Sequence, residues 1–175
     1  MIWMEAEVET LRDIPPQEGG VLLIGINPSP VSVAAGHYYQ GTLGKRLWGR
    51  MRRVGLLADD SHWEDEAFTG VGHGLTDIVK RPTTGEAALM RGEIEFGTGL
   101  LRKNVAAWKP SLVLFAFKAP ADALLGGSAD PGEGPPFEGI PTFRLSPPYA
   151  RREDVAENER LLVRVLKRGV LGKDG

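Results

Sequence analysis

The chain has 175 residues, of which 42% are hydrophobic and 25% charged, and this composition predicts one globular domain over 1–175, with its core in about 18–170. With 21 Lys and Arg against 23 Asp and Glu, the formal net charge is -2, so nucleic-acid binding would need local basic patches. The absence of cysteine excludes disulfide frameworks, thiolate zinc sites, iron–sulfur clusters and a cysteine nucleophile. We expect no metal and no cofactor.

The first residues, 1–10, contain neither a basic segment nor an apolar core of the kind found in targeting peptides. The uninterrupted apolar runs of the chain are short, whereas a span of the bilayer needs roughly 20 residues. We therefore expect a soluble cytoplasmic protein with no membrane partner.

The first half of the chain alternates strand and helix signals. Residues 21–26 form a continuous apolar run, which is typical of a central parallel strand buried on both faces. Residues 45–54 place Leu47, Trp48 and Met51 on one helical face. A shorter strand is predicted over 75–79.

The alternation continues through the middle of the chain. Residues 86–108 are helical in pattern, with an expected interruption around Gly97 and Gly99. A second continuous apolar run, 111–117, predicts another central strand, and 119–125 predicts a short helix.

The last elements complete the pattern. A Pro- and Gly-rich stretch, 130–136, is expected to be irregular and to precede a strand over 140–145. A helix is expected from about 152 to 168, ending at Gly169, with acids near its start and bases near its end. The whole predicts a single-domain, three-layer α/β fold with a mostly parallel sheet of four to five strands flanked by helices.

Polar residues follow the expected strands, where open parallel sheets bind ligands. Asn27 follows the first strand, Asp77 lies in the second and Lys118 follows the third. Asn27 could equally open a turn, because Asn-Pro is common there. Asp77 could equally pair with a neighbouring cation, since a carboxylate in an apolar strand needs a partner or access to the crevice; the candidates are Lys80, Arg81 and Lys118.

Two loops near these strand ends carry aromatic side chains. Residues 36–41 place aromatic rings between glycines and could hold a flat ring. Residues 147–152 combine prolines, an aromatic ring and two arginines. This second loop is either a stiff connection into the last helix or a wedge that enters a duplex while its arginines reach phosphates.

Four motifs, taken in their order and spacing, resemble the mismatch-specific uracil and thymine DNA glycosylases of the uracil-DNA glycosylase superfamily. They are Gly25-Ile26-Asn27-Pro28, Gly36-His37-Tyr38-Tyr39, Leu47-Trp48 and Thr76-Asp77-Ile78-Val79-Lys80-Arg81-Pro82-Thr83. The resemblance covers roughly 21–168 and implies that superfamily's fold, with no metal or cofactor. The absence of cysteine separates this chain from the superfamily's iron–sulfur branches.

The resemblance also implies roles for individual residues. Asn27 would position the water that attacks C1′, and Tyr39 would stack on the flipped base. The remaining base contacts would come from Ile26, Ser29, His37, Tyr38 and Ser146.

The chain departs from its relatives at three places. Ser29 stands where they usually have Gly, and Asp77 where the better-known ones have Lys or Asn. A carboxylate here could act as a general base or stabilise an oxocarbenium-like sugar, so Asp77 joins Asn27 as a catalytic candidate. The loop that starts at Ser146 also differs, which leaves open whether Tyr149, Ala150 or Arg151 is the wedge.

These residues favour a monofunctional glycosylase that removes uracil, from G:U mismatches above all, or another deaminated or damaged base, and leaves an abasic site. Its partner would be double-stranded DNA containing uracil or a mismatched base, and it would be a nucleoid-associated monomer of bacterial type. The expected DNA contacts are Lys45, Arg46, Lys80, Arg81, Pro148, Tyr149, Ala150, Arg151 and Arg152. Two alternatives are a lesion-binding relative with little catalysis and an unrelated α/β hydrolase or nucleotide-binding domain for a small ligand.

Overall fold

The computed structural model describes residues 1–58, 62–127 and 130–171 and is built around one five-stranded sheet, with strand order β4–β3–β5–β7–β6. Four of its strands are mutually parallel and β6 runs antiparallel to β7 at one edge. The strands are β3 (Val21–Gly25), β4 (Gly74–Asp77), β5 (Leu112–Phe115), β6 (Gly132–Phe137) and β7 (Ile140–Arg144). The mostly parallel α/β sheet expected from the sequence is confirmed.

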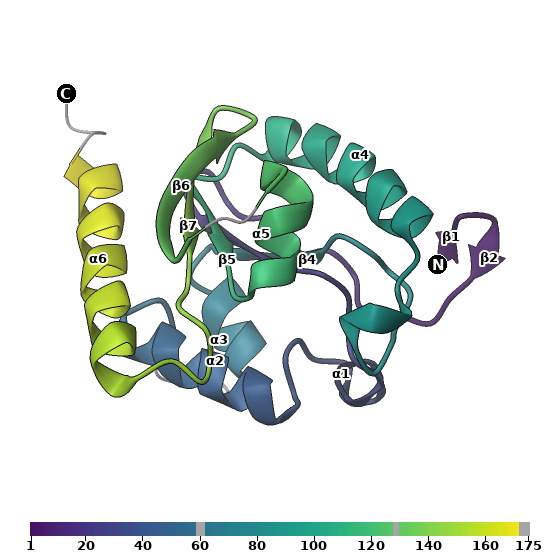
Figure 1. Ribbon diagram of the computed structural model, residues 1–175, viewed down its shortest axis with the longest axis horizontal. Coiled ribbons are helices and arrows are strands. Elements are labelled where there is room, and N and C mark those ends of the chain that lie inside the picture. The colour runs from purple at the N-terminus through teal and green to yellow at the C-terminus, as the bar shows by residue number, and fades with distance from the viewer. Residues whose placement is uncertain (59–61, 128–129, 172–175) are drawn as a thin grey trace.

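The helices surround this sheet, and a small separate hairpin lies at the N-terminus (Figure 1). The helices are α1 (Pro30–Ala35), α2 (Thr42–Arg53), α3 (Glu64–Thr69), α4 (Arg91–Trp108), α5 (Lys118–Leu125) and α6 (Arg152–Leu171), with a 3₁₀ turn, η1 (Glu86–Ala88), before α4. The hairpin pairs β1 (Ile2–Trp3) with β2 (Ala6–Glu7).

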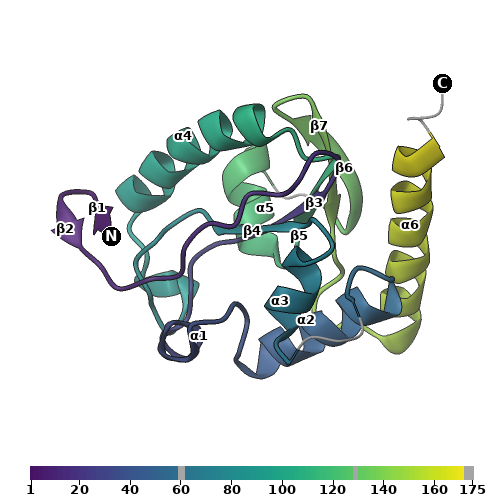
Figure 2. The ribbon, with the colours of Figure 1, turned by 180° about the vertical axis from the view of Figure 1, so that it is seen from behind.

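The sheet is covered on both faces, which accounts for its continuous apolar strands. Leu22 and Ile24 of β3 pack in one cluster with Val105 of α4 and with side chains of α5. Val21 and Leu23 face the other way and pack with Trp48 and with side chains of α3 and α6. Figures 1 and 2 show the same division, with α4 and α5 on one side of the sheet and α2 and α3 on the other. Alternate residues of a strand point to opposite faces, so both sets must be hydrophobic.

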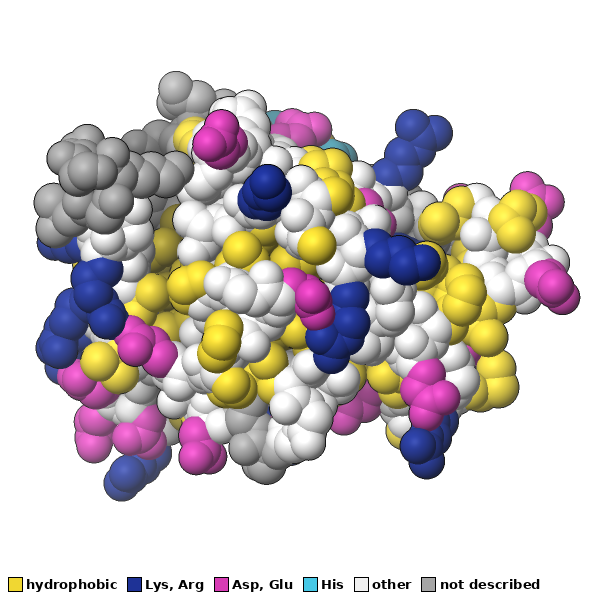
Figure 3. Space-filling model, turned by 90° about the horizontal axis from the view of Figure 1, so that it is seen from above, with side chains coloured by type: hydrophobic (Ala, Val, Ile, Leu, Met, Phe, Trp, Pro, Cys, Tyr) yellow, Lys and Arg dark blue, Asp and Glu magenta, His cyan; other side chains and the backbone are white. Residues whose placement is uncertain are grey.

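The surface above α4 has no single sign of charge. Figure 3 shows basic and acidic side chains interspersed on this face, with hydrophobic side chains both across its middle and beside the N-terminal hairpin. Among the described helices, none combines the length and the apolar character that a bilayer crossing requires.

The Pro- and Gly-rich segment expected to be irregular is instead the edge strand β6. Its prolines are compatible with this place because an edge strand leaves some of its N–H positions unpaired. The register between β6 and β7 shifts between Gly134 and Phe137, which marks the irregularity that the prolines impose.

The helix boundaries also differ from the sequence-based expectation. The helix expected from residue 86 starts at Arg91 and runs without a break through Gly97 and Gly99. The last helix passes Gly169 and ends at Leu171. The short α1 was not predicted, although Ser29 at its N-cap, Pro30 at its first position and Gly36 in a left-handed cap are ordinary start and stop signals. The short α3 and the N-terminal hairpin were not predicted either.

Gly97 and Gly99 have opposite surroundings on the same helix, which gives a matched pair of variants. A Cβ at Gly97 would lie 2.0 Å from the backbone oxygen of Ile78, whereas a Cβ at Gly99 would meet nothing within 4 Å. We expect Gly97→Ala to force α4 off the sheet and lower the free energy of unfolding by about 1–3 kcal/mol. Gly99→Ala should instead raise it by about 0.5–1 kcal/mol because alanine favours the helix.

Urea unfolding of the two variants and the wild type tests this expectation. Equal effects of the two substitutions would show that the close approach of α4 to Ile78 does not constrain the fold.

Candidate active site

Two of the polar residues predicted at the strand ends, Asn27 and Asp77, lie where the connections after neighbouring strands lead to opposite faces of the sheet. The third, Lys118, is exposed at the start of α5 and pairs with Asp122. The segment after β3 leads to α2 on one face, and the segment after β5 leads to α5 on the other. Open α/β sheets bind ligands at such a switch point. Asn27 lies just beyond β3, and Phe117 lies just beyond β5.

The motif after β3 is paired with the motif that ends β4. Gly25 is the register partner of Asp77, so these two residues are neighbours across the sheet. The pairing continues beyond the strands, because Ile78 N donates to Gly25 O at 3.0 Å and Val79 N donates to Ile26 O at 2.8 Å. The two motifs identified in the sequence therefore form one structural unit.

The amide of Asn27 is oriented by the second motif. Its Nδ2 donates to Thr83 Oγ1 at 2.8 Å, to Arg81 O at 3.1 Å and to Pro28 O at 3.2 Å. All three of these hydrogen bonds use the nitrogen, so Oδ1 is the atom left to accept a hydrogen bond from a water or a ligand. Asn27 is thus held by tertiary contacts rather than by a local turn of its own.

Asp77 places a carboxyl group in the sheet, directly over Gly25. The residue is only 4% exposed, and a Cβ at Gly25 would lie 2.1 Å from Asp77 Oδ1 and 2.7 Å from the hydroxyl of Tyr39. Burial raises the pKa of Asp77 to about 7; Lys80 opposes this rise and Asp13 adds to it. A carboxyl group with such a pKa can exchange a proton near neutral pH.

Lys80, one of the expected DNA contacts, points into the protein. Lys80 is 7% exposed, and its Nζ donates to Asp77 O at 2.6 Å and to Thr76 Oγ1 at 3.2 Å and forms an ion pair with Asp13. Lys80 therefore supports the end of β4 and counteracts the negative charge around Asp77.

Tyr39 lies against the same strand ends. Its ring meets that of Trp48 edge-on, with centroids 5.8 Å apart, and lies 6.4 Å from the ring of Phe117. Its hydroxyl is buried without a hydrogen-bond partner among the described residues. Burial, followed by the charge of Asp77, raises the pKa of this hydroxyl well above its usual value. A buried hydroxyl without a partner is costly, which makes it available to a bound ligand.

Tyr38 and His37, both predicted base contacts, have structural partners. Tyr38 is in the core, its Oη donates to Arg12 O at 3.1 Å and its N–H donates to Asp65 Oδ2 at 2.9 Å. His37 Nδ1 lies 2.9 Å from Asp65 Oδ1, and its ring stacks on Trp63 with centroids 3.9 Å apart. These side chains fasten the aromatic loop to α3, and the base contacts predicted for them stay predictions.

Ile26 and Ser29, both predicted base contacts, flank Asn27 and Pro28 in the chain. Ile26 is half-buried and packs toward the α4 side of the sheet. Ser29 caps α1, because its Oγ accepts a hydrogen bond from Ser32 N at 3.2 Å. This cap gives the serine a structural reason to stand where relatives have Gly.

Arg81, one of the expected DNA contacts, is held in an ion pair although its side chain is 35% exposed. Its guanidinium binds Glu93 through two hydrogen bonds of 2.7 Å. Glu93 is buried and also accepts a hydrogen bond from Met90 N at the start of α4. Arg81 therefore anchors the segment that orients Asn27.

A basic cleft of about 650 Å³ lies between α2, the end of β5 and the start of α6. It brings together four of the predicted DNA contacts, namely Lys45, Arg46, Pro148 and Arg152. Phe117 also lines the cleft, and its ring lies close to Tyr39. The cleft therefore leads from an exposed basic surface toward the strand-end residues.

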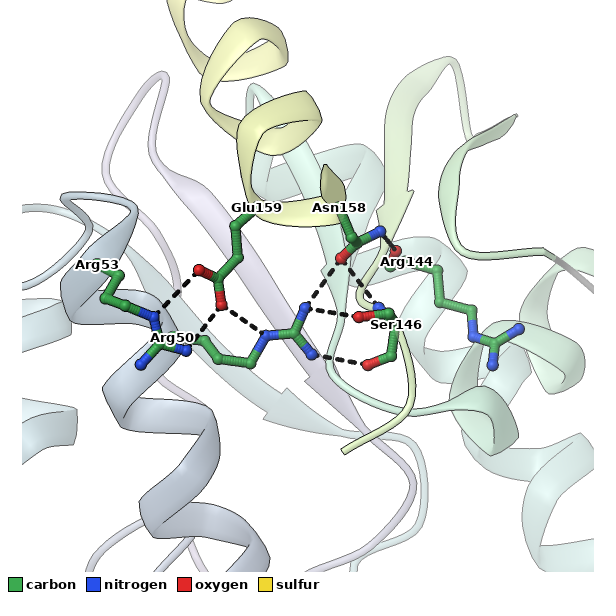
Figure 4. A network of polar contacts seen from close by, with 6 residues as sticks. All are labelled: Arg50, Arg53, Arg144, Ser146, Asn158 and Glu159. Atoms are coloured by element: carbon green, nitrogen blue, oxygen red, sulfur yellow. Dashed lines mark hydrogen bonds and ion pairs between the residues drawn. The ribbon is translucent and has the colours of Figure 1, made fainter. Parts of the chain in front are cut away.

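The loop after β7 has a buried start and an exposed tip. Ser146 is buried, and Arg50 and Asn158 bind its polar groups (Figure 4). Ser146, a predicted base contact, thus anchors the start of the loop through its polar groups. Tyr149, by contrast, is 76% exposed, and the guanidinium carbon of Arg46 lies 5.4 Å from its ring centroid. Ala150 and Arg151 follow in a short turn, where Arg151 pairs with Asp154.

Three contributors to the site were missed from the sequence. Thr83 was quoted as part of a motif, but its bond to Asn27 depends on tertiary structure. Gly25 also belongs to a quoted motif. A glycine at the end of a buried strand often marks a place where another group approaches the backbone closely, so its contact with Asp77 could have been expected. Arg50 stands in a basic stretch of the sequence that could rim the crevice, but its contact with Ser146 gave no signal because the two residues lie far apart in the chain. Within the described ranges, no His, Asp and Glu side chains gather into a group of three that could hold a metal ion.

Comparisons with known proteins agree with this geometry. The family model of the uracil DNA glycosylase superfamily matches residues 11–166. A G/U mismatch-specific uracil DNA glycosylase of Schizosaccharomyces pombe is 27% identical over 97 residues, which cover 54% of this chain and only 30% of that protein. Because the family match includes both paired motifs, the basic cleft and the loop after β7, this chain belongs to the uracil DNA glycosylase superfamily.

Proposed function

We propose that this protein is a DNA glycosylase that hydrolyses the N-glycosidic bond of uracil in double-stranded DNA, at G:U mismatches above all, and leaves an abasic site. The observation that carries the proposal is the pairing of the two motifs, which places the Asn27 amide and the buried Asp77 carboxyl at adjoining strand ends. The name of the fission-yeast relative supports uracil opposite guanine as the substrate.

The hydrolysis needs one water molecule and one base. Asn27 Oδ1 accepts a hydrogen bond from the water and aims it at C1′, and ionised Asp77 takes the water's proton. The water oxygen bonds to C1′ while the bond from C1′ to N1 of uracil breaks, and the electron pair leaves with N1. A base whose pKa is near the working pH is well matched to this proton transfer, and the negative charge of Asp77 also stabilises an oxocarbenium-like sugar.

The target base must leave the duplex before this chemistry, because an atom inside the base stack cannot be reached. Tyr39 supplies an aromatic surface against which the flipped base stacks, and the backbone at Ile26 and Ser29 contacts the edge of the base. Tyr39 Oη is buried without a hydrogen-bond partner among the described residues, and a Cβ at Gly25 would approach both this hydroxyl and Asp77 Oδ1. The hydroxyl is therefore suited to bind a polar group that enters beside Asp77.

The basic cleft accounts for the DNA contacts. Lys45, Arg46 and Arg152 bind backbone phosphates next to the strand-end residues. These contacts fix the register of the duplex on the protein. Among the three wedge candidates, the 76% exposure of Tyr149 and its size favour this residue for the space that the flipped base leaves, with Pro148, Ala150 and Arg151 as its flanks.

Removing either catalytic candidate should abolish most of the chemistry. We expect Asn27→Ala and Asp77→Asn each to slow single-turnover cleavage by about 10²- to 10⁴-fold, the range typical of positioned acid–base groups. Duplexes with uracil opposite guanine, uracil opposite adenine and thymine opposite guanine, scored after alkaline strand scission, measure the rates and rank the substrates. Glu138→Gln, at the β6–β7 turn, is the control and should keep the wild-type rate. Wild-type protein that forms no abasic site on any of the three duplexes would refute the proposed activity for these bases.

The pKa of Asp77 predicts a particular pH dependence. Because burial raises this pKa to about 7, the carboxyl is mostly protonated below that pH and mostly ionised above it. The single-turnover rate should therefore rise with pH through about 7 and then level off. Asp77→Asn should remove this rise, whether Asp77 acts as base or as electrostatic partner. The measurement uses saturating protein, so that changes in DNA binding do not enter. An identical rise in Asp77→Asn would assign the titration to another group.

A further inference from the structure

One buried guanidinium ties the start of the loop after β7 to two helices (Figure 4). Arg50 of α2 is 6% exposed, and its Nη1 donates to Ser146 O at 2.7 Å while its Nη2 donates to Ser146 Oγ at 3.0 Å. Its Nη2 also donates to Asn158 Oδ1 at 3.0 Å, and its Nε donates to Glu159 Oε1 at 3.2 Å. The planar guanidinium thus fixes α2, α6 and the loop relative to one another.

Asn158 completes the network from α6. Its Oδ1 also accepts a hydrogen bond from Ser146 N at 2.9 Å, and its Nδ2 donates to Arg144 O at 3.2 Å. The N–H, carbonyl and hydroxyl of Ser146 are therefore all bound. This satisfied network defines where the chain leaves β7 and in which direction it continues.

Stability alone is a weak reason for this arrangement. Burial disfavours the charged form of Arg50 and lowers the pKa of its guanidinium, and Glu159 only opposes that effect. Packed hydrophobic side chains often serve stability as well as a buried ion pair does, whereas a hydrogen-bonded network restricts geometry. The geometry restricted here is that of a short loop whose tip, Tyr149, is exposed.

We propose that Arg50 and Asn158 are positioning residues for strand opening: they hold the base of the loop rigid so that Tyr149 can be driven between stacked bases. A wedge on a flexible loop would be displaced by the stacked bases instead of separating them, because unstacking a base costs about a few kcal/mol. This inference rests on the proposed glycosylase function, and neither residue takes part in the bond-breaking step.

The experiment compares Asn158→Ala, Asn158→Asp and a destabilised control, Val105→Ala, each below the temperature at which it begins to melt. Asn158→Asp keeps the oxygen that binds Arg50 and Ser146. Val105 is buried between α4 and the other face of the sheet, so its truncation weakens the fold without touching the network. The readouts are the single-turnover rate on a uracil:guanine duplex and the fluorescence of 2-aminopurine placed beside the uracil, which rises when the stack opens.

We expect Asn158→Ala to lower the single-turnover rate by about tenfold or more and to reduce the fluorescence rise. The reason is that the cost of unstacking the bases is no longer met by a rigid loop. Val105→Ala should stay near wild type in both readouts, and Asn158→Asp, which loses only the donation to Arg144 O, should lose less than Asn158→Ala. The inference is wrong if Asn158→Ala opens the stack as fully as wild type, or if Val105→Ala loses as much as Asn158→Ala. A wild type that opens the stack but forms no abasic site would instead refute the proposed chemistry and leave the positioning role intact.

Discussion

The pairing of β3 with β4 beyond the ends of both strands is the constraint on which the site depends. Two backbone hydrogen bonds, from Ile78 to Gly25 and from Val79 to Ile26, keep the two motifs in register after the regular sheet has ended. This register brings Asp77 beside Gly25 and lets Thr83 reach Asn27. Backbone geometry therefore places the two catalytic candidates. The neighbouring side chains orient the amide of Asn27 and influence the pKa of Asp77.

The buried carboxyl of Asp77 is costly to the fold and useful to the chemistry. A group whose pKa is raised by folding favours the protonated state, so its contribution to stability is present at low pH and is lost as the pH rises toward about 7. Lys80 limits the cost by lying near the end of β4, where it also binds Asp13. Such an exchange of stability for a useful pKa is common at active sites.

The sheet could be predicted because its signal is local. Strands buried on both faces must be apolar throughout, and 21–26 and 111–117 show this directly. The edge strand β6 escaped prediction because Pro135 and Pro136 give it the composition of a loop, and only its place at the edge makes them tolerable. Short helices such as α1 bury too few side chains to produce a helical period of hydrophobic residues in the sequence.

The strand-end candidates could be located from the sequence, whereas the partners of several charged or polar residues could not. Lys80 and Arg81 stand in a motif that suggests DNA binding, yet they form ion pairs with Asp13 and Glu93. The sequence predicts that Ser146 contacts the base, whereas in the structure Arg50, 96 positions away along the chain, binds it. Tertiary partners decide whether a cation is free for a ligand, and a single sequence does not record them.

The most direct measurement of the central claim is the cleavage rate of Gly25→Ala on a uracil:guanine duplex. A methyl group here would lie 2.1 Å from a carboxyl oxygen of Asp77 and 2.7 Å from the hydroxyl of Tyr39, so both groups must shift, while the basic cleft that we propose for DNA binding is left untouched. We predict that cleavage falls to the level of Asp77→Asn, while Gly92→Ala, whose added methyl would meet nothing within 4 Å, keeps the wild-type rate. Full activity in Gly25→Ala would contradict the assignment of the chemistry to this strand-end junction.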